Sequence, residues 1–127
     1  MTQKEKQILI RDLCARLPYG TYVHHKNFSD AKFKVIAVFD DGRLGVTENE
    51  IPLTPTSINE CKPYLRPMSN MTEEERDELA SIQEKNLPYP SVKYSGCDYL
   101  NSIHVDYRGL IPMGLALEAK EGMYKTE

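Results

Sequence analysis

The chain has 127 residues, of which 40% are hydrophobic and 28% are charged, and its formal net charge is -3 at pH 7. That length suits one domain with its own hydrophobic core, while the negative balance and the scattered basic residues disfavour a general polyanion binder. The longest apolar runs fall well short of a membrane-spanning helix, so no membrane partner is expected.

Cysteine content and the first residues indicate a compartment. Cys14, Cys61 and Cys97 are an odd number without CxxC spacing, so neither a disulfide framework nor a structural zinc site is predicted. The opening residues MTQKEKQ have no apolar segment of the kind that signal peptides contain. We therefore expect a cytoplasmic protein with no bound metal and no cofactor.

The N-terminal residues predict a helix from about residue 3 to residue 17. Thr2 and Glu5 have the spacing of a capping box, and Pro18 with Gly20 ends the pattern. The apolar stripe behind the box consists of Ile10, Leu13, Cys14 and Leu17.

A small, twisted antiparallel sheet is predicted to follow. Asp41 and Gly42 indicate a two-residue type I′ hairpin, which would pair Phe39 with Leu44. A curl of this sheet toward an SH3-like barrel is an open alternative. The predicted strands are Tyr22–Phe28, Phe33–Phe39 and Glu50–Leu53.

Prolines dominate the next stretch, and their spacing predicts an extended connector over residues 54–72 that lies on the surface. Thr72 and Glu75 then form a second capping box, which opens a charged helix that ends near Asn86. A linker over residues 87–91 follows.

A third helix is predicted over residues 97–107, with Ser95 as its N-cap. Gly109 and Pro112 end it, and Leu115–Ala119 is predicted to form either a final short strand or an extended pass across the core. The apolar stripe of this third helix, at spacings of three and four, consists of Cys97, Leu100, His104, Tyr107 and Ile111.

Together these elements predict the α+β class and a single domain over residues 1–127. The N-terminal helix and the sheet occupy residues 1–53, and the proline-rich connector occupies residues 54–72. Residues 73–127 form a helical half with a short C-terminal extended segment. The C-terminal helix is expected to pack in the core.

One candidate cluster for chemistry lies in the third predicted helix. His104, Asp106, Tyr107 and Arg108 offer a base, an orienting carboxylate, a phenol and an anion clamp. On a helix, however, His104 and Asp106 would point about 200° apart. We expect a buried, hydrogen-bonded His104 and an Arg108 that caps the helix end. An enzyme centred on His104 and Arg108 is therefore the third-ranked hypothesis.

A candidate nucleic-acid surface interleaves aromatic rings with positive charge on the first predicted strands. This pattern is typical of small sheets that stack bases and contact phosphates. A nucleic-acid-binding module is the second-ranked hypothesis, although the negative net charge predicts weak or no binding at physiological salt. The residues are Tyr22, His24, Lys26, Lys32 and Lys34.

Two strings in the second half of the chain are distinctive. They are KPYLRPMSNMTEEE over residues 62–75, and HVDYRGLI over residues 104–111 followed by GLALEA over residues 114–119. They resemble a family of small proteins from gut Bacteroides-type bacteria and their phages or integrated elements. The resemblance implies a cytoplasmic setting and an origin on mobile DNA, and it brings no reaction or ligand. The first-ranked hypothesis is therefore a non-enzymatic binding or adaptor domain with a protein partner.

Overall fold

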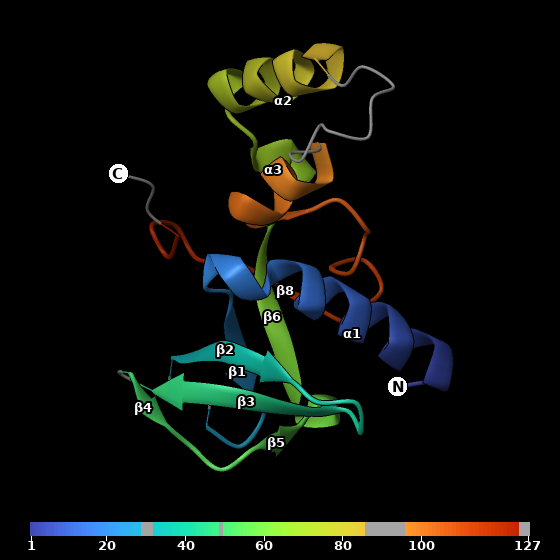
Figure 1. Cartoon of the computed structure of the whole chain (residues 1–127), viewed down its shortest axis with the longest axis vertical. Coiled ribbons are helices and arrows are strands. Elements are labelled where there is room, and N and C mark those ends of the chain that lie inside the picture. The colour runs from blue at the N-terminus through green and yellow to red at the C-terminus, as the bar shows by residue number, and fades with distance from the viewer. Residues whose placement is uncertain (29–31, 49, 86–95, 125–127) are drawn as a thin grey trace.

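The computed structural model begins with the helix α1 (Gln3–Arg16) (Figure 1). The Thr2 hydroxyl accepts the Glu5 N–H at 3.1 Å, and the Glu5 carboxylate accepts the Thr2 N–H at 2.8 Å. This reciprocal pair satisfies donors that the first helical turn leaves open. The predicted N-terminal helix and its capping box are therefore confirmed. The residues that the structure describes are 1–28, 32–48, 50–85 and 96–124.

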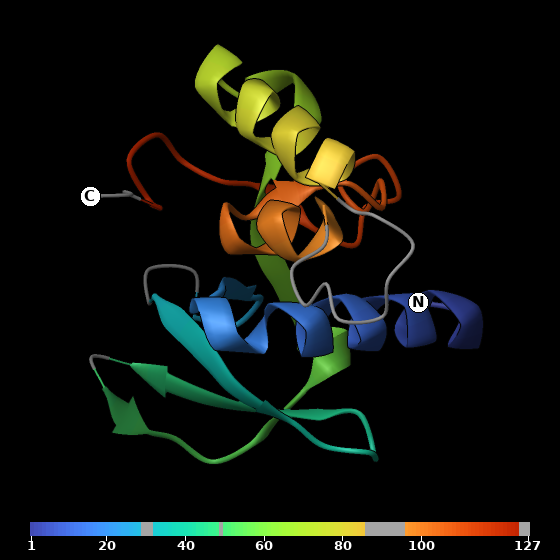
Figure 2. The same cartoon turned by 45° about the horizontal axis from the view of Figure 1, so that its top comes forward.

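A curled sheet lies beneath α1 (Figures 1 and 2). Its strands are β1 (Tyr22–His25), β2 (Phe33–Val38), β3 (Arg43–Glu48), β4 (Ile51–Pro52), β5 (Thr56–Ser57) and β6 (Cys61–Pro67). The spatial order is β4-β3-β2-β1-β6 with every neighbouring pair antiparallel, and β5 pairs with β3. Within the described ranges no backbone pairing joins β6 to β4 or β5. Across the described residues the sheet therefore stays open on that side and does not close into a barrel.

The hairpin between β2 and β3 corrects the predicted two-residue type I′ turn. A type I′ turn needs positive φ at two successive residues. In this loop only Gly42 has a positive φ, at 86°. A three-residue loop forms instead, in which the Gly42 N–H donates to the Phe39 carbonyl at 3.1 Å. Val38, and not Phe39, therefore lies opposite Leu44.

The surface connector predicted over residues 54–72 is wrong, because this stretch contains the strand β6 and its buried side chains. Cys61 is 2% exposed and Leu65 is fully buried. Pro63 lies opposite Val23. The Thr21 carbonyl accepts the Val35 N–H from β2, and in an antiparallel pair every second residue bonds to the same neighbour, so the backbone groups of Val23 also face β2. By the alternation of an antiparallel ladder, the proline then removes no hydrogen bond between β1 and β6.

The second predicted capping box is confirmed at the start of α2 (Glu73–Lys85). The Glu75 N–H donates to the Thr72 hydroxyl at 3.1 Å, and the Thr72 N–H donates to the Glu75 carboxylate at 2.9 Å. The predicted linker over residues 87–91 and the predicted N-cap Ser95 lie outside the described residues.

The third helix, α3 (Gly96–Ser102), ends earlier than predicted. His104 has φ 63°, which breaks the helix, and histidine tolerates this left-handed conformation better than most residues. The chain then enters the strand β7 (Val105–Asp106), which pairs in parallel with β6. Tyr107 therefore lies outside the helix that was expected to contain it.

The predicted final strand is present as β8 (Leu117–Glu118), also parallel to β6. These two parallel additions make the sheet mixed rather than purely antiparallel. The fold is α+β, as predicted. None of the described helices combines the length and apolar character that crossing a membrane requires.

The strand β6 runs from the curled sheet up to α2 and α3 (Figure 1). The buried apolar side chains form two clusters. The larger one fills the space between α1 and the sheet, and it includes Leu9, Leu13, Val23, Phe33, Leu44 and Leu65. The smaller one attaches α3 and consists of Met71, Leu100, Ile103 and Val105.

Tyr124 joins the C-terminal segment to the seam between β1 and β6. Its hydroxyl accepts the Tyr22 N–H at 2.9 Å and donates to the Tyr64 carbonyl at 2.8 Å. Its ring stacks on His104 at 3.7 Å between ring centres, and on Tyr22 at 5.5 Å. One side chain therefore completes a backbone ladder and fills the space beside α3.

Replacing Tyr124 by Phe is expected to destabilise the protein by about 1–3 kcal/mol, because the Tyr22 N–H and the Tyr64 carbonyl lose their bridge. Tyr124→Leu should cost more, since it also removes the stacked ring. Urea denaturation of the two variants measures both losses. Equal stability of Tyr124→Phe and the wild type would show that the hydroxyl bridge contributes nothing.

Candidate functional site

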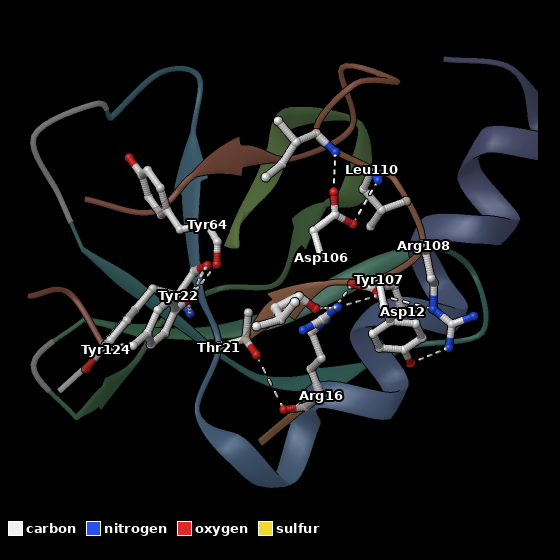
Figure 3. A network of polar contacts seen from close by, with 12 residues as sticks. Asp12, Arg16, Thr21, Tyr22, Tyr64, Asp106, Tyr107, Arg108, Leu110 and Tyr124 are labelled. Atoms are coloured by element: carbon white, nitrogen blue, oxygen red, sulfur yellow. Dashed lines mark hydrogen bonds and ion pairs between the residues drawn. The ribbon is translucent and has the colours of Figure 1, made fainter. Parts of the chain in front are cut away.

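The predicted cluster of His104, Asp106, Tyr107 and Arg108 does not form a catalytic set. Figure 3 shows the contacts of Asp106, Tyr107 and Arg108. The Asp106 carboxylate accepts the backbone N–H groups of Leu110 and Ile111, both at 2.9 Å. Asp106 therefore closes a turn and does not orient the histidine.

Arg108 and Tyr107 belong to a network around the helix α1. Asp12 and Arg16 are both fully buried, with Arg16 Nε 2.8 Å from Asp12 Oδ2. Arg16 Nη2 donates to the Val105 carbonyl at 2.8 Å, and Arg108 Nε donates to Asp12 Oδ1 at 3.1 Å. The Tyr107 ring lies beside both guanidinium groups, at 5.0 Å and 5.5 Å from its centre. Arg108 thus pairs with Asp12. The sequence had led us to expect that it would cap the end of α3.

This network was missed at the level of the sequence. Asp12 and Arg16 have the i,i+4 spacing of a helical ion pair, but that spacing is usual on exposed helix faces and does not indicate burial. Within the described residues, Arg16 Nη1 has no hydrogen-bond partner.

His104 is buried as predicted, but the predicted hydrogen bonding of its ring is not found at Nδ1. Its side chain packs flat on Tyr124, and Nδ1 has no hydrogen-bond partner in the part of the chain that the structure describes. Burial, together with the positive charges of Arg16 and Arg66, lowers the pKa of His104 to about 4. The ring is therefore neutral at pH 7.

Arg16→Met is expected to destabilise the fold by about 3–5 kcal/mol, because it leaves the buried Asp12 carboxylate without its main partner. Arg108→Met should cost on the order of 1 kcal/mol, since the Arg108 side chain is 33% exposed. Urea denaturation at pH 7 compares the two. Equal losses in the two variants would contradict the central role of Arg16.

His104 predicts a specific loss of stability in acid. An unfolded histidine titrates near 6.5 and the folded one near 4, so between these values only the unfolded chain binds the proton. Stability should therefore fall by about 3 kcal/mol as the pH drops from about 6.5 to about 4. Urea denaturation across this range should show a shallower pH dependence for His104→Asn, which tolerates the left-handed φ. Identical slopes would rule this assignment out.

An apolar pocket opens at the mouth of the curled sheet, with a volume of about 320 Å³. Its floor is the inner face of the sheet, and its rim carries the exposed side chains of Phe28 and Leu53. The lining residues are Val23, His25, Phe28, Phe33, Val46, Leu53, Thr54, Pro55, Thr56 and Cys61.

The polar groups on the pocket wall are already bonded to one another. His25 Nδ1 accepts the Asn27 N–H at 3.1 Å, so the proton of the neutral ring lies on Nε2. Nε2 lies 3.0 Å from the Thr56 hydroxyl and 3.1 Å from the Glu60 carboxylate. Neither ring nitrogen is left to accept a proton from a ligand. Burial raises the pKa of the Cys61 thiol to about 11, so it is not a reactive thiolate at pH 7.

The predicted nucleic-acid residues Tyr22, His24 and Lys34 come together on the outer face of the sheet. Tyr22 lies opposite Lys34 on β2, and His24 lies opposite a residue that the sequence missed, Lys62 on β6. Lys62 was missed because it lies far along the chain, in the stretch that was predicted to be a connector.

The other two predicted residues flank this group. The Lys32 ammonium lies 4.2 Å from the centre of the Tyr22 ring. Lys26 follows β1 and lines a shallow hollow together with His24, Glu60 and Lys62.

Comparison with protein-family models, with curated proteins and with solved structures finds no match to this chain. Among the described residues, no three His, Cys, Asp or Glu side chains are grouped as a metal site requires.

Proposed function

We propose that the protein is a non-enzymatic binding domain whose apolar pocket receives an apolar side chain of a partner protein. The observation that carries the proposal is the pocket of about 320 Å³ at the mouth of the sheet. Its walls are mostly apolar, and its histidine is already bonded to the Thr56 hydroxyl and to the Glu60 carboxylate behind the wall. Such a site offers burial to an apolar group and few polar groups for chemistry.

The rim supports a protein partner over a small molecule. Phe28 is 58% exposed, Leu53 is 41% exposed, and the neighbouring Ile51 is 65% exposed. Large apolar side chains grouped at an open pocket are typical of surfaces that a partner covers. The volume is at the lower end of the range for small-molecule pockets, and it suits one large side chain.

Addition of a partner strand is a less suitable mode of binding here. The edge strand β4 is only two residues long, and Pro52 in it has no N–H to offer. Recognition would therefore come from the side chain in the pocket and from the apolar rim.

A cytoplasmic setting and an origin on phage or mobile DNA belong to the same proposal. The unpaired state of Cys14, Cys61 and Cys97 supports a reducing compartment. The resemblance of the strings over residues 62–75 and 104–119 supports the origin.

Selection of displayed peptides on the immobilised protein tests the proposal. We expect selected peptides to share one large apolar residue and to bind with micromolar affinity in calorimetry. Phe28→Ala combined with Leu53→Ala should weaken that binding at least tenfold, because it removes the rim. Both side chains are exposed, so the fold should be retained.

Ile36→Ala is the matched control, since Ile36 is 52% exposed and does not line the pocket. It should leave the affinity unchanged. The proposal fails if no apolar peptide is selected, or if the selected peptides bind the rim variant as tightly as the wild type.

A further inference from the structure

We propose that the outer face of β1, β2 and β6 binds single-stranded nucleic acid. This basic face consists of Tyr22, His24, Lys26, Lys32, Lys34 and Lys62. The basic face lies on the opposite side of the sheet from the apolar pocket. Binding of nucleic acid to this face can therefore be tested independently of the proposed binding of a protein partner in the pocket.

The strand register places these side chains on one face. Residues directly opposite each other in an antiparallel pair project to the same side. Tyr22 is opposite Lys34, and His24 is opposite Lys62. The intervening Val23 is fully buried on the other side, in the core. The register therefore gathers side chains from three strands on one face of the sheet.

Charge on this surface differs in sign from the charge of the whole chain. The chain carries a net charge of -3, but β1, β2 and β6 contain no Asp or Glu at all. The nearest acidic neighbour in the hollow beside His24 is Glu60, whose carboxylate is bonded to His25. The four lysines thus form a patch that suits a row of phosphates.

The aromatic residues favour a single strand over a duplex. Tyr22 and His24 are two residues apart on β1, which places them about 6.7 Å apart along the strand. That is about twice the 3.4 Å rise between stacked bases, so an extended strand can present successive bases to the two rings. A duplex keeps its bases stacked inside and would offer only its phosphates.

Besides its stacking on Tyr124, Tyr22 contacts Lys32, and His24 contacts Tyr64. Lys32 covers the Tyr22 ring at 4.2 Å, so a base that stacks there displaces the ammonium toward a phosphate. The His24 ring is held edge-on against Tyr64, at 6.2 Å between ring centres and 88° between planes. His24 is thereby oriented before any base arrives.

Fluorescence anisotropy with labelled oligothymidine and oligouridine twelve-mers tests the inference. We expect micromolar binding in 50 mM salt that weakens roughly 20- to 50-fold in 200 mM salt, as three or four phosphate contacts to a single strand predict. Lys34→Glu with Lys62→Glu should abolish binding, and His24→Ala should weaken it at least fivefold. A duplex of the same length should bind more weakly than the single strands.

Lys4→Glu with Arg11→Glu is the matched control. It makes the same change in net charge at two exposed residues of α1, away from the basic face. Thermal denaturation checks that every variant is folded. The inference is overturned if no binding occurs at 50 mM salt, if the control loses as much affinity as Lys34→Glu with Lys62→Glu, or if the duplex binds at least as tightly.

Discussion

The arrangement of the chain depends on the buried ion pair between Asp12 and Arg16. Removing two charges from water costs several kcal/mol for each, and that cost is offset only where the charged groups are well bonded. Here Arg16 reaches the Val105 carbonyl, and Arg108 adds a second cation to Asp12. Because these bonds have fixed directions, they set how the first helix sits against the last third of the chain. Apolar contacts alone would leave α1 freer to slide.

Local signals in the sequence were sufficient for the helix starts and insufficient for the strand β6. A capping box involves four consecutive residues, so Thr2 and Thr72 reveal their helices directly. Pro63 looks like a surface residue in any local window, and it is tolerated in β6 only because Val23 faces the other way. Likewise, the end of α3 depends on the left-handed φ of His104 and on pairing with β6, which a helical periodicity cannot reveal.

The candidate sites, too, could be predicted where their residues are close in the sequence and not where they come from distant parts of the chain. The alternation of β1 sends His24 outward and His25 into the pocket wall, so two neighbouring histidines serve opposite faces. The sequence identified the outward set on β1 and β2, because its residues are near one another in the chain. It missed Lys62 and the pocket, since both require β6 to return beside β1 from about forty residues away.

The bridge formed by Tyr124 has a consequence for the order of folding. The β1–β6 seam brings Tyr22 beside Tyr64, and the residue that bridges them lies 102 residues after Tyr22 and 60 residues after Tyr64 in the chain. Formation of contacts between distant residues is slow, because the ends of a long loop must first meet. The Tyr124 bridge is therefore expected to form late in folding, on a pair of strands that is already in place.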